Sequence, residues 1–435
     1  MANIINANQQ FFDNNGNPLN GGLLYSYEIT STTPKSLYTT SAATTALSNP
    51  VVLDAYGRKS AGIFGTGLYR LILKTSAGVT LWDVDNVSMS NTIELNRENL
   101  LYNPDFAITQ RMGNGSLALS DDQYGPDRWY LLTSGGSPTL DTDAWSLAYA
   151  WGTLGNLSFI EISPGASLRF GLAQIVPTKK AVSTIGRTVT YTGIVGSPSA
   201  ATTINAAILA WTGTADTVTS DIVNDWTNAS LTTGNFFNAL NLSVVGTTSV
   251  ATATTGPASG KSTYTAQYTV TGTVPASTTN LIVMFWTNDA FGTSIVGTAK
   301  QLVIGSDVNL FSAPEYQTEL RKCLPFYEKS FPPATAPAQN AGTTDAITQP
   351  QLVAASTAGR LPFYPYKSHK YGTVSLTLYN PSAANAQLRN TTGGTDWSGT
   401  ALVQTTHGFA VTGTSPGGSA ATDQTLYHFT ASSEL

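Results

Sequence analysis

Residues 67–87, GLYRLILKTSAGVTLWDVDNV, carry the clearest β-hairpin pattern in the chain. Side chains in the first half fall into two alternating sets, as in a strand with two distinct faces: Tyr69, Leu71 and Leu73 against Arg70, Ile72 and Lys74. Residues 75–78 supply the turn, and residues 79–87 form the returning strand. The stretch predicts antiparallel β structure in this part of the chain.

A second stretch, SNPVVLDAYGRKSAGIF at residues 48–64, places a turn between two apolar runs. The Asp54 side chain can accept a hydrogen bond from the backbone two residues on, and Gly57 can adopt a positive φ. The alternative is that Asp54 and Arg58 form a functional pair. A turn accounts for these residue types without one, so we predict a structural turn.

Further short runs with a strand pattern are separated by Gly, Ser and Thr loops. We predict strands within residues 23–29, 156–162, 186–195, 203–211, 262–274, 280–286, 371–380, 399–413 and 425–432. One segment, residues 314–330, predicts a short helix. Pro314 suits its first turn, and an apolar stripe follows at Tyr316, Leu320, Cys323 and Leu324.

The predicted fold class is therefore all-β, with a small β-sandwich-like module followed by jelly-roll or β-sandwich structure. We divide the chain into an N-terminal module (1–95) and a jelly-roll domain ending in the short helix (96–330). A C-terminal β region (331–435) packs on the jelly roll or completes it. The charged stretch near Glu94, Arg97 and Glu98 suits the first boundary.

Composition excludes several classes of function. Charged residues make up 11% of the 435 residues, against roughly 25% in an ordinary soluble domain. The net charge is -5 and no Lys/Arg block is present, so no nucleic-acid partner is expected. No run approaches the roughly 18 apolar residues of a membrane helix, and the first residues do not resemble a secretory signal. The single cysteine, Cys323, excludes an intrachain disulfide framework and a cysteine zinc site, and we predict that it is a partly buried small apolar residue.

No catalytic, metal or cofactor site is predicted. TTGPASGKST (254–263) lacks the spacing of a phosphate-binding loop and precedes a strand pattern, so we predict a hairpin turn. His369, His407 and His428 have no ligand spacing, although a shared metal is left open. Three acidic pairs leave glycoside hydrolysis open as a minor alternative, because the sequence gives no distance between their carboxylates. They are Asp83/Asp85, Asp121/Asp122 and Asp141/Asp143.

Aromatic residues are the best binding candidates, because sugar rings stack on aromatic planes while amides and hydroxyls bind their hydroxyl groups. The chain has 8 Trp and 19 Tyr. Trp82, Trp129 and Trp286 lie in apolar strand patterns and are predicted core residues. The candidate ligand-binding residues, each with a core role as its alternative, are Trp145, Trp151, Trp226 and Trp397.

Residues 14–87 resemble a module found near the N-terminus of many tailed-bacteriophage fibre and tail proteins. The motifs that carry this resemblance occur in order: YSYE (25–28), TTPK (32–35), NPVVLDAYGR (49–58) and the hairpin ending in LWDVDNV (81–87). Residues 99–435 are similar to the carbohydrate-binding-like jelly-roll domain of phage fibre and host-attachment proteins. Its motifs are NPDFAITQRMG (103–113), GPDRWYL (125–131), LRKCLPFYEKSF (320–331) and FTASSEL (429–435). The family pattern QRG is interrupted by Met112, which predicts a different local turn.

The resemblance implies a structural virion protein without enzymatic activity, made in the host cytoplasm and commonly a homotrimer. Its N-terminal module would join other virion proteins, and its distal domains would face host surface polysaccharide or protein. A tail fibre or adhesin-type receptor-binding protein is the first expectation. The alternatives are a head fibre, capsid-decorating or collar protein that binds no receptor and, less favoured, a polysaccharide-degrading tailspike.

Overall fold

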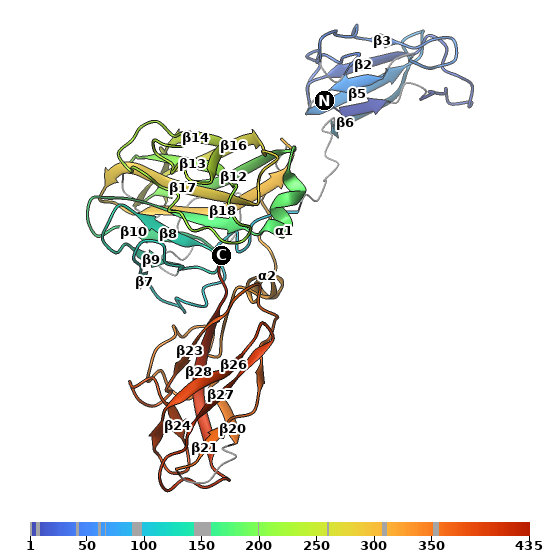
Figure 1. Ribbon diagram of the computed structural model, residues 1–435. Coiled ribbons are helices and arrows are strands. Elements are labelled where there is room, and N and C mark those ends of the chain that lie inside the picture. The colour runs from blue at the N-terminus through green and yellow to red at the C-terminus, as the bar shows by residue number, and fades with distance from the viewer. Residues whose placement is uncertain are drawn as a thin grey trace. The chain divides into compact units, whose positions relative to one another are not determined.

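The structure, a computed structural model, is built almost entirely of antiparallel strands (Figure 1), which confirms the predicted all-β class. Its contacts divide into two compact units, Met1–Asn96 and Arg97–Leu435. The structure describes residues 2–5, 9–40, 43–59, 62–65, 67–88, 98–142, 158–198, 200–258, 261–306, 311–350 and 356–435.

The first unit is built around a four-stranded sheet in the order β3-β2-β5-β6. Its strands are β2 (Leu23–Tyr27), β3 (Val51–Val52), β5 (Leu68–Lys74) and β6 (Thr80–Ser88). A separate pair joins β1 (Ala2–Ile5) to β4 (Ile63–Gly65). The predicted hairpin is present as β5 and β6, and Leu24, Leu71 and Leu73 from one face of the sheet are buried in the core.

The turn between β3 and β4 is the structural turn that the sequence predicts. The Asp54 carboxylate accepts hydrogen bonds from the backbone N–H of Tyr56 at 2.9 Å and of Arg58 at 2.8 Å. Gly57 has φ of +67°, and a Cβ there would lie 2.3 Å from the carbonyl oxygen of Phe11. The Arg58 guanidinium donates to Gln10 at 3.1 Å. These contacts fix the conformation of an exposed turn.

The second unit begins with two antiparallel sheets that face each other across one core, which confirms the predicted jelly-roll or sandwich fold. The seven-stranded sheet has the order β15-β16-β12-β18-β10-β9-β7, and the five-stranded sheet β14-β13-β17-β11-β8. The strands are β7 (Leu117–Ala118), β8 (Tyr130–Thr133), β9 (Thr139–Asp141), β10 (Ile160–Ser163), β11 (Leu168–Val176), β12 (Thr188–Ser197), β13 (Thr203–Trp211), β14 (Leu242–Ala251), β15 (Ala253–Ala258), β16 (Lys261–Thr273), β17 (Asn280–Phe291) and β18 (Ile295–Ile304). A one-turn helix, α1 (Thr178–Ala181), runs into a 3₁₀ turn (Val182–Thr184).

The outer face of the five-stranded sheet is covered by the loop 212–241. Trp286 on β17 is fully buried beneath this loop, and Phe236 stacks on its indole with ring centroids 5.0 Å apart. Phe237 meets the same indole edge-on at 5.7 Å. The loop thus gives this sheet a second apolar core on its outer side.

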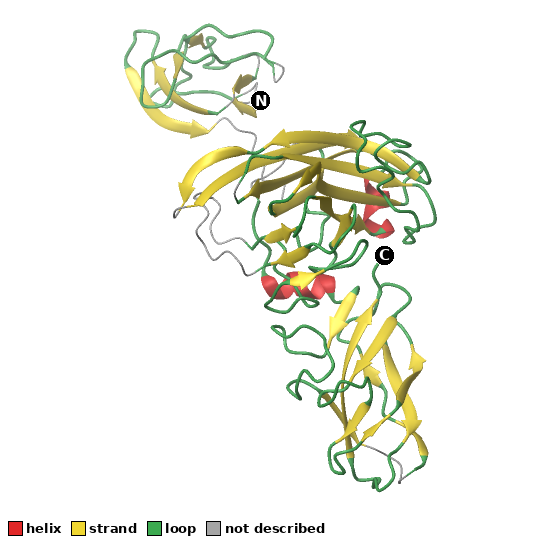
Figure 2. Cartoon of the chain, turned by 90° about the vertical axis from the view of Figure 1, so that its left-hand side faces the viewer, coloured by secondary structure: helices red, strands yellow, loops and turns green. Residues whose placement is uncertain are grey.

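The C-terminal part of the second unit forms its own sheets, as Figure 2 shows, and shares no described strand with the jelly roll. Its elements are α2 (Tyr316–Cys323), β19 (Tyr327–Lys329), β20 (Ile347–Pro350), β21 (Ala358–Arg360), β22 (Tyr364–Pro365), β23 (Ser375–Tyr379), β24 (Leu388–Asn390), β25 (Asp396–Trp397), β26 (Gly399–Gln404), β27 (Gly408–Thr414) and β28 (Gln424–Ser432). Strand β28 organises the six-stranded sheet, because β19, β20, β23 and β24 all pair with it.

The predicted helix is present as α2, with different ends and a different buried face. Glu315 caps its N-terminus by accepting from the backbone N–H of Gln317 and Thr318, so Pro314 lies before the helix. Tyr316 was predicted on the buried stripe, but it is 43% exposed. Glu319 is buried instead, because its carboxylate accepts from the backbone N–H of Asn103 at 2.7 Å.

Candidate binding groove

A groove with a cavity volume of 570 Å³ lies within the second unit. Three stretches of chain supply most of its lining: the loop 106–114, helix α2 and residues 329–367. The side chains used below are Gln110, Asn114, Tyr316, Leu320, Leu324, Lys329, Phe331, Asp345, Tyr364 and Lys367. A volume of this size matches the clefts that hold small ligands in proteins.

The jelly-roll loop that forms one wall is packed directly against the C-terminal part. Gly113 has φ of +64°, and a Cβ there would lie 2.6 Å from the carbonyl oxygen of Ala334. The backbone N–H of Asn114 donates to that same oxygen at 3.2 Å. The neighbouring Met112 is 3% exposed, since its side chain enters the jelly-roll core. The residue that interrupts the QRG pattern therefore anchors this wall.

A second part of the lining is largely apolar. Leu320 lies in α2, Leu324 directly follows this helix, and Phe331 follows β19. Phe331 is 4% exposed and stacks on the His428 ring, with centroids 4.0 Å apart. His428 is fixed in turn by hydrogen bonds to Ser330 and to the carbonyl of Gly342, each at 3.0 Å. Burial lowers the pKa of His428.

Exposed polar groups lie along the mouth of the groove. Asn114, Asp345 and Lys367 are solvent-exposed, and within the described ranges their side chains form no hydrogen bond to the protein. Tyr316 is exposed as well, and the Tyr364 ring is half-buried against Phe409. Amide, carboxylate, ammonium and phenol groups are thus available to a ligand at one place.

Lys329 presents a nearly buried ammonium group to the groove. The residue is 4% exposed, and Nζ donates to the carbonyl oxygens of Pro333 at 3.0 Å and Thr335 at 2.7 Å. An ammonium has three donors, so one remains for a ligand. Burial lowers the pKa of Lys329 to about 8, and the charge of Asp127 opposes this shift.

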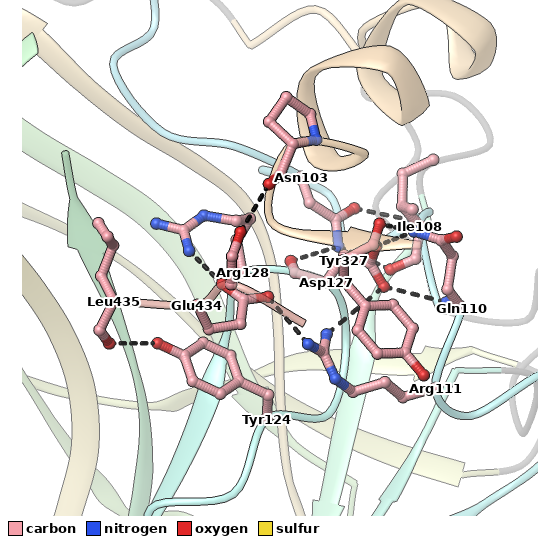
Figure 3. A network of polar contacts seen from close by, with 12 residues as sticks. Asn103, Ile108, Gln110, Arg111, Tyr124, Asp127, Arg128, Tyr327, Glu434 and Leu435 are labelled. Carbon is pink, nitrogen blue, oxygen red and sulfur yellow. Dashed lines mark hydrogen bonds and ion pairs between the residues drawn. The ribbon is translucent and has the colours of Figure 1, made fainter. Parts of the chain in front are cut away.

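A charged cluster holds the jelly roll to the C-terminal part beside the groove (Figure 3), and we call it the junction cluster: Arg111, Asp127, Arg128 and Glu434. The Glu434 carboxylate pairs with Arg111 at 3.0 Å and also with Arg128. The Arg111 guanidinium lies 3.7 Å from the ring centre of Tyr327. Gln110 links the cluster to the groove, because its amide donates to Asp127 and to the carbonyl of Tyr327 at 3.0 Å.

The groove contains none of the described tryptophan candidates. Trp397 is 5% exposed and belongs to the C-terminal core, so its ring is not free to stack on a ligand. Trp226 lies in the loop 212–241, half-buried edge-on against Phe236. Trp145 and Trp151 lie outside the described residues. As predicted, Trp129 and Trp286 are fully buried, and Trp82 packs against the core of the first unit.

The remaining sequence motifs lie outside the groove or in the protein core. The described residues of 254–263 lie in β15 and β16, which pair antiparallel as the predicted hairpin requires. The rings of His369 and His407 lie 4.0 Å apart, while His428 is buried elsewhere. Across the described ranges no group of three or more His, Cys, Asp or Glu side chains is arranged to hold a metal ion. Cys323, predicted to be partly buried, is fully buried.

The acidic pairs differ in their surroundings. Asp83 forms an ion pair with Arg70 at 2.6 Å. Asp121 accepts from the backbone N–H of Thr133 at 2.7 Å, while burial and the nearby charges of Asp121 and Asp221 raise the pKa of Asp122 to about 6. Asp143 lies outside the described residues. No helix in the described part of the chain is long and apolar enough to cross a bilayer.

No protein-family model matches this chain. No curated protein matches it in sequence either. Similar solved structures include a CBM4 protein, 13% identical with a TM-score of 0.25, which spans 46% of this chain and 100% of its own. TmCBM61 in complex with β-1,4-galactotriose is 13% identical with a TM-score of 0.25, over 48% of this chain and 99% of its own. The enzymatically active domain of tailspike protein 4 of bacteriophage CBA120 is 12% identical with a TM-score of 0.24, over 48% of this chain and 21% of its own. Similarity at this level identifies neither a family nor a ligand.

Proposed function

We propose that this protein is a non-enzymatic attachment protein of a tailed-phage virion, and that its groove binds glycans of the host surface. The groove is the observation that carries the binding part of the proposal. Its wall combines apolar side chains with an exposed tyrosine, and its mouth presents an amide, a carboxylate and an ammonium. Glycans are bound by this combination, because their rings have apolar C–H faces and polar rims.

The virion part of the proposal rests on the sequence resemblance of residues 14–87. This stretch lies in a unit with its own core, which suits a module that joins other virion proteins. Several copies on one particle, in a trimer or a larger array, would turn weak single contacts into firm attachment. A head fibre or collar protein remains the alternative. Immunogold electron microscopy of intact particles separates the two, since label at the tail supports attachment and label on the capsid contradicts it.

Binding is tested with the full chain on an array of host-surface polysaccharides. The variants Tyr316→Ala and Asn114→Ala each remove one exposed groove contact, and we expect an affinity loss of about tenfold. Tyr56→Ala is the control, because Tyr56 is an exposed tyrosine, 68% exposed, in the first unit. Equal binding by all four proteins would contradict the groove as the site. Release of reducing ends from a bound polysaccharide would contradict the absence of enzymatic activity.

A further inference from the structure

The ionisable side chains of the groove favour one chemical class of ligand. Apart from tyrosines, they are Lys329, Lys367 and Asp345, which amount to two cations and one anion. This excess of positive charge contrasts with the net charge of -5 on the whole chain. Phe331 and Leu324 surround these groups with apolar surface, where charge pairs are less screened than in open solvent.

The acidic side chains next to the groove are already engaged, so they leave its cations available. Glu328 pairs with Lys370 at 2.8 Å and accepts from the backbone N–H of Lys367 at 3.0 Å. Asp127 accepts from the side chain of Gln110 and lies 4.0 Å from Arg111. Neither carboxylate forms an ion pair with a groove lysine in the described part of the chain.

Lys329 is suited to bind an anion because its position is fixed before a ligand arrives. Its two bonds to the carbonyl oxygens of Pro333 and Thr335 hold the ammonium in place. Those carbonyls are neutral, and the Asp127 carboxylate favours the ammonium without forming an ion pair with it in the described part of the chain. A ligand carboxylate that took the third N–H would supply both a hydrogen bond and a directly paired countercharge. Lys367, exposed at the mouth, adds a second cation.

We propose, building on the glycan-binding function above, that the groove selects glycans that carry a carboxylate, with the acid group on Lys329 and Lys367. Asp345 and Asn114 then form hydrogen bonds with the neutral hydroxyl groups of the same or the next sugar. The specificity comes from charge, so esterification of the ligand abolishes it while leaving the sugar rings unchanged.

The test uses the full chain and three acidic polymers: polygalacturonate, hyaluronate and polysialate. Each is compared with its methyl ester by affinity electrophoresis and calorimetry. We expect at least one acid form to bind about tenfold or more tightly than its ester, the scale of a charged hydrogen bond. Equal binding of acid and ester would overturn the carboxylate preference and leave glycan binding intact. If none of the acid forms binds and neutral glycans do, the preference is overturned in the same way. If no glycan of either kind binds, both proposals fail.

Variants of the two groove lysines test where the carboxylate of the ligand binds. Lys367→Gln should weaken binding of the acid form about fivefold to tenfold and leave the ester unchanged. Lys179→Gln, at an exposed lysine on α1, is the control with the same change in net charge. Lys329→Met keeps the apolar stem, and its melting temperature is measured beside its affinity. If Lys367→Gln and Lys179→Gln bind the acid form alike, the assignment to this groove is wrong.

A pH series gives a readout that a structural role of Lys329 would not produce. The charge of Asp127 raises the pKa of Lys329 and so favours the ammonium. The other charged side chains of the groove lining are Asp345 and Lys367, and both are exposed. Affinity for the acid form should fall as the pH rises through about 8, where the Lys329 ammonium loses its proton. Binding of the ester should not change over this range. An unchanged affinity of the acid form would overturn the role of Lys329.

Discussion

Two regions of the second unit each bury a cation completely, and they compensate the charge differently. In the junction cluster the Arg128 guanidinium pairs with Glu434 and donates to the carbonyl of Ile175 at 2.7 Å. It also lies 3.7 Å from the ring centre of Phe326. This cation therefore has an anion, a carbonyl and an aromatic face as partners.

The jelly-roll core holds the second cation with far less support. The Lys300 ammonium donates to the carbonyl of Ile194 at 3.0 Å and lies 3.8 Å from the ring centre of Phe285. No described carboxylate pairs with it. Burial alone lowers the pKa of Lys300 well below its ordinary value. Space for this side chain comes from Gly193, where a Cβ would lie 2.6 Å from Lys300 Cδ.

The comparison shows that burial of charge has different consequences for stability in the two regions. A paired arginine keeps its charge, and removal of its partner leaves that charge isolated in an apolar site. An unpaired buried lysine has no such partner, so burial disfavours its charged form and lowers its pKa. Changes to these residues should therefore affect stability in opposite directions.

The largest effect is expected from Glu434→Ala, because it leaves Arg111 and Arg128 without their shared anion. The free energy of unfolding of the second unit should fall by about 3–5 kcal/mol. Urea unfolding followed by tryptophan fluorescence measures it. Glu98→Ala is the control, since the Glu98–Lys180 pair is exposed and should contribute less than about 1 kcal/mol. Equal losses in the two variants would contradict the special role of the junction cluster.

The next prediction compares two buried lysines whose replacement should change the free energy of unfolding in opposite directions. Lys300→Met should raise the free energy of unfolding by about 1–3 kcal/mol at pH 7, because no ion pair is lost and a buried amine is removed. Lys370→Met should lower it by about 3 kcal/mol, because Glu328 is left buried without its partner at 2.8 Å. Thermal and urea unfolding of the two variants give the comparison. A loss in both variants would show that Lys300 is a net stabilising residue.

Lys300 also makes the stability of the second unit depend on pH. Its pKa is lowered in the folded state, so between that lowered pKa and the ordinary value of 10.5 the unfolded chain binds one more proton than the folded chain. Stability of the second unit therefore rises with pH across this window, and Lys300→Met should remove that slope. Urea unfolding at a series of alkaline pH values tests this.

Asp127 makes stability depend on acidic pH, with a smaller effect than that of Lys300 and in the opposite direction, since stability falls as the pH rises. Burial raises its pKa from 3.8 to about 6, so its contribution to stability is complete below pH 3.8 and is lost as the pH rises through 6. The shift of about two units corresponds to about 2–3 kcal/mol. Asp127→Asn should flatten the stability profile between pH 4 and 6. A profile identical to that of the wild type would contradict the assignment.

The smallest effect is expected from Tyr124→Phe, which removes one hydrogen bond from the edge of the junction cluster. The Tyr124 hydroxyl donates to the carbonyl oxygen of Leu435 at 2.9 Å. Its loss should cost about 1 kcal/mol, well below the loss caused by Glu434→Ala. Comparable losses would show that hydrogen bonding, rather than charge pairing, dominates the cluster.

The fold was predictable where one strand or turn could be recognised from adjacent residues. The hairpin at 67–87, the Asp54 turn and the strand at 203–211 are all present. Strands β11, β14 and β18 were not recognised. Strand β11 is buried on both faces over most of its length and lacks clear alternation, while β14 consists mainly of small and hydroxyl side chains. Periodicity alone does not separate such strands from loops.

The groove was not predictable because its residues are distant in the sequence. Asn114, Lys329 and Lys367 come together only when the jelly roll meets the C-terminal part. Sequence composition pointed to tryptophans, and the described tryptophans pack in or against the cores instead. A usable signal was present in α2, where Glu319 interrupts the expected apolar face. Tyr316, in the first turn of the same helix, remains exposed and lines the groove.

The junction cluster also sets an order of events during synthesis. Arg128 leaves the ribosome 306 residues before Glu434, its charge partner in the folded protein. All the described jelly-roll strands are synthesised before Glu434, so a jelly roll that folds as it emerges would hold the Arg128 guanidinium without its carboxylate partner. Docking of the C-terminal sheets is then the last step, and it should coincide with the moment at which the groove first becomes able to bind.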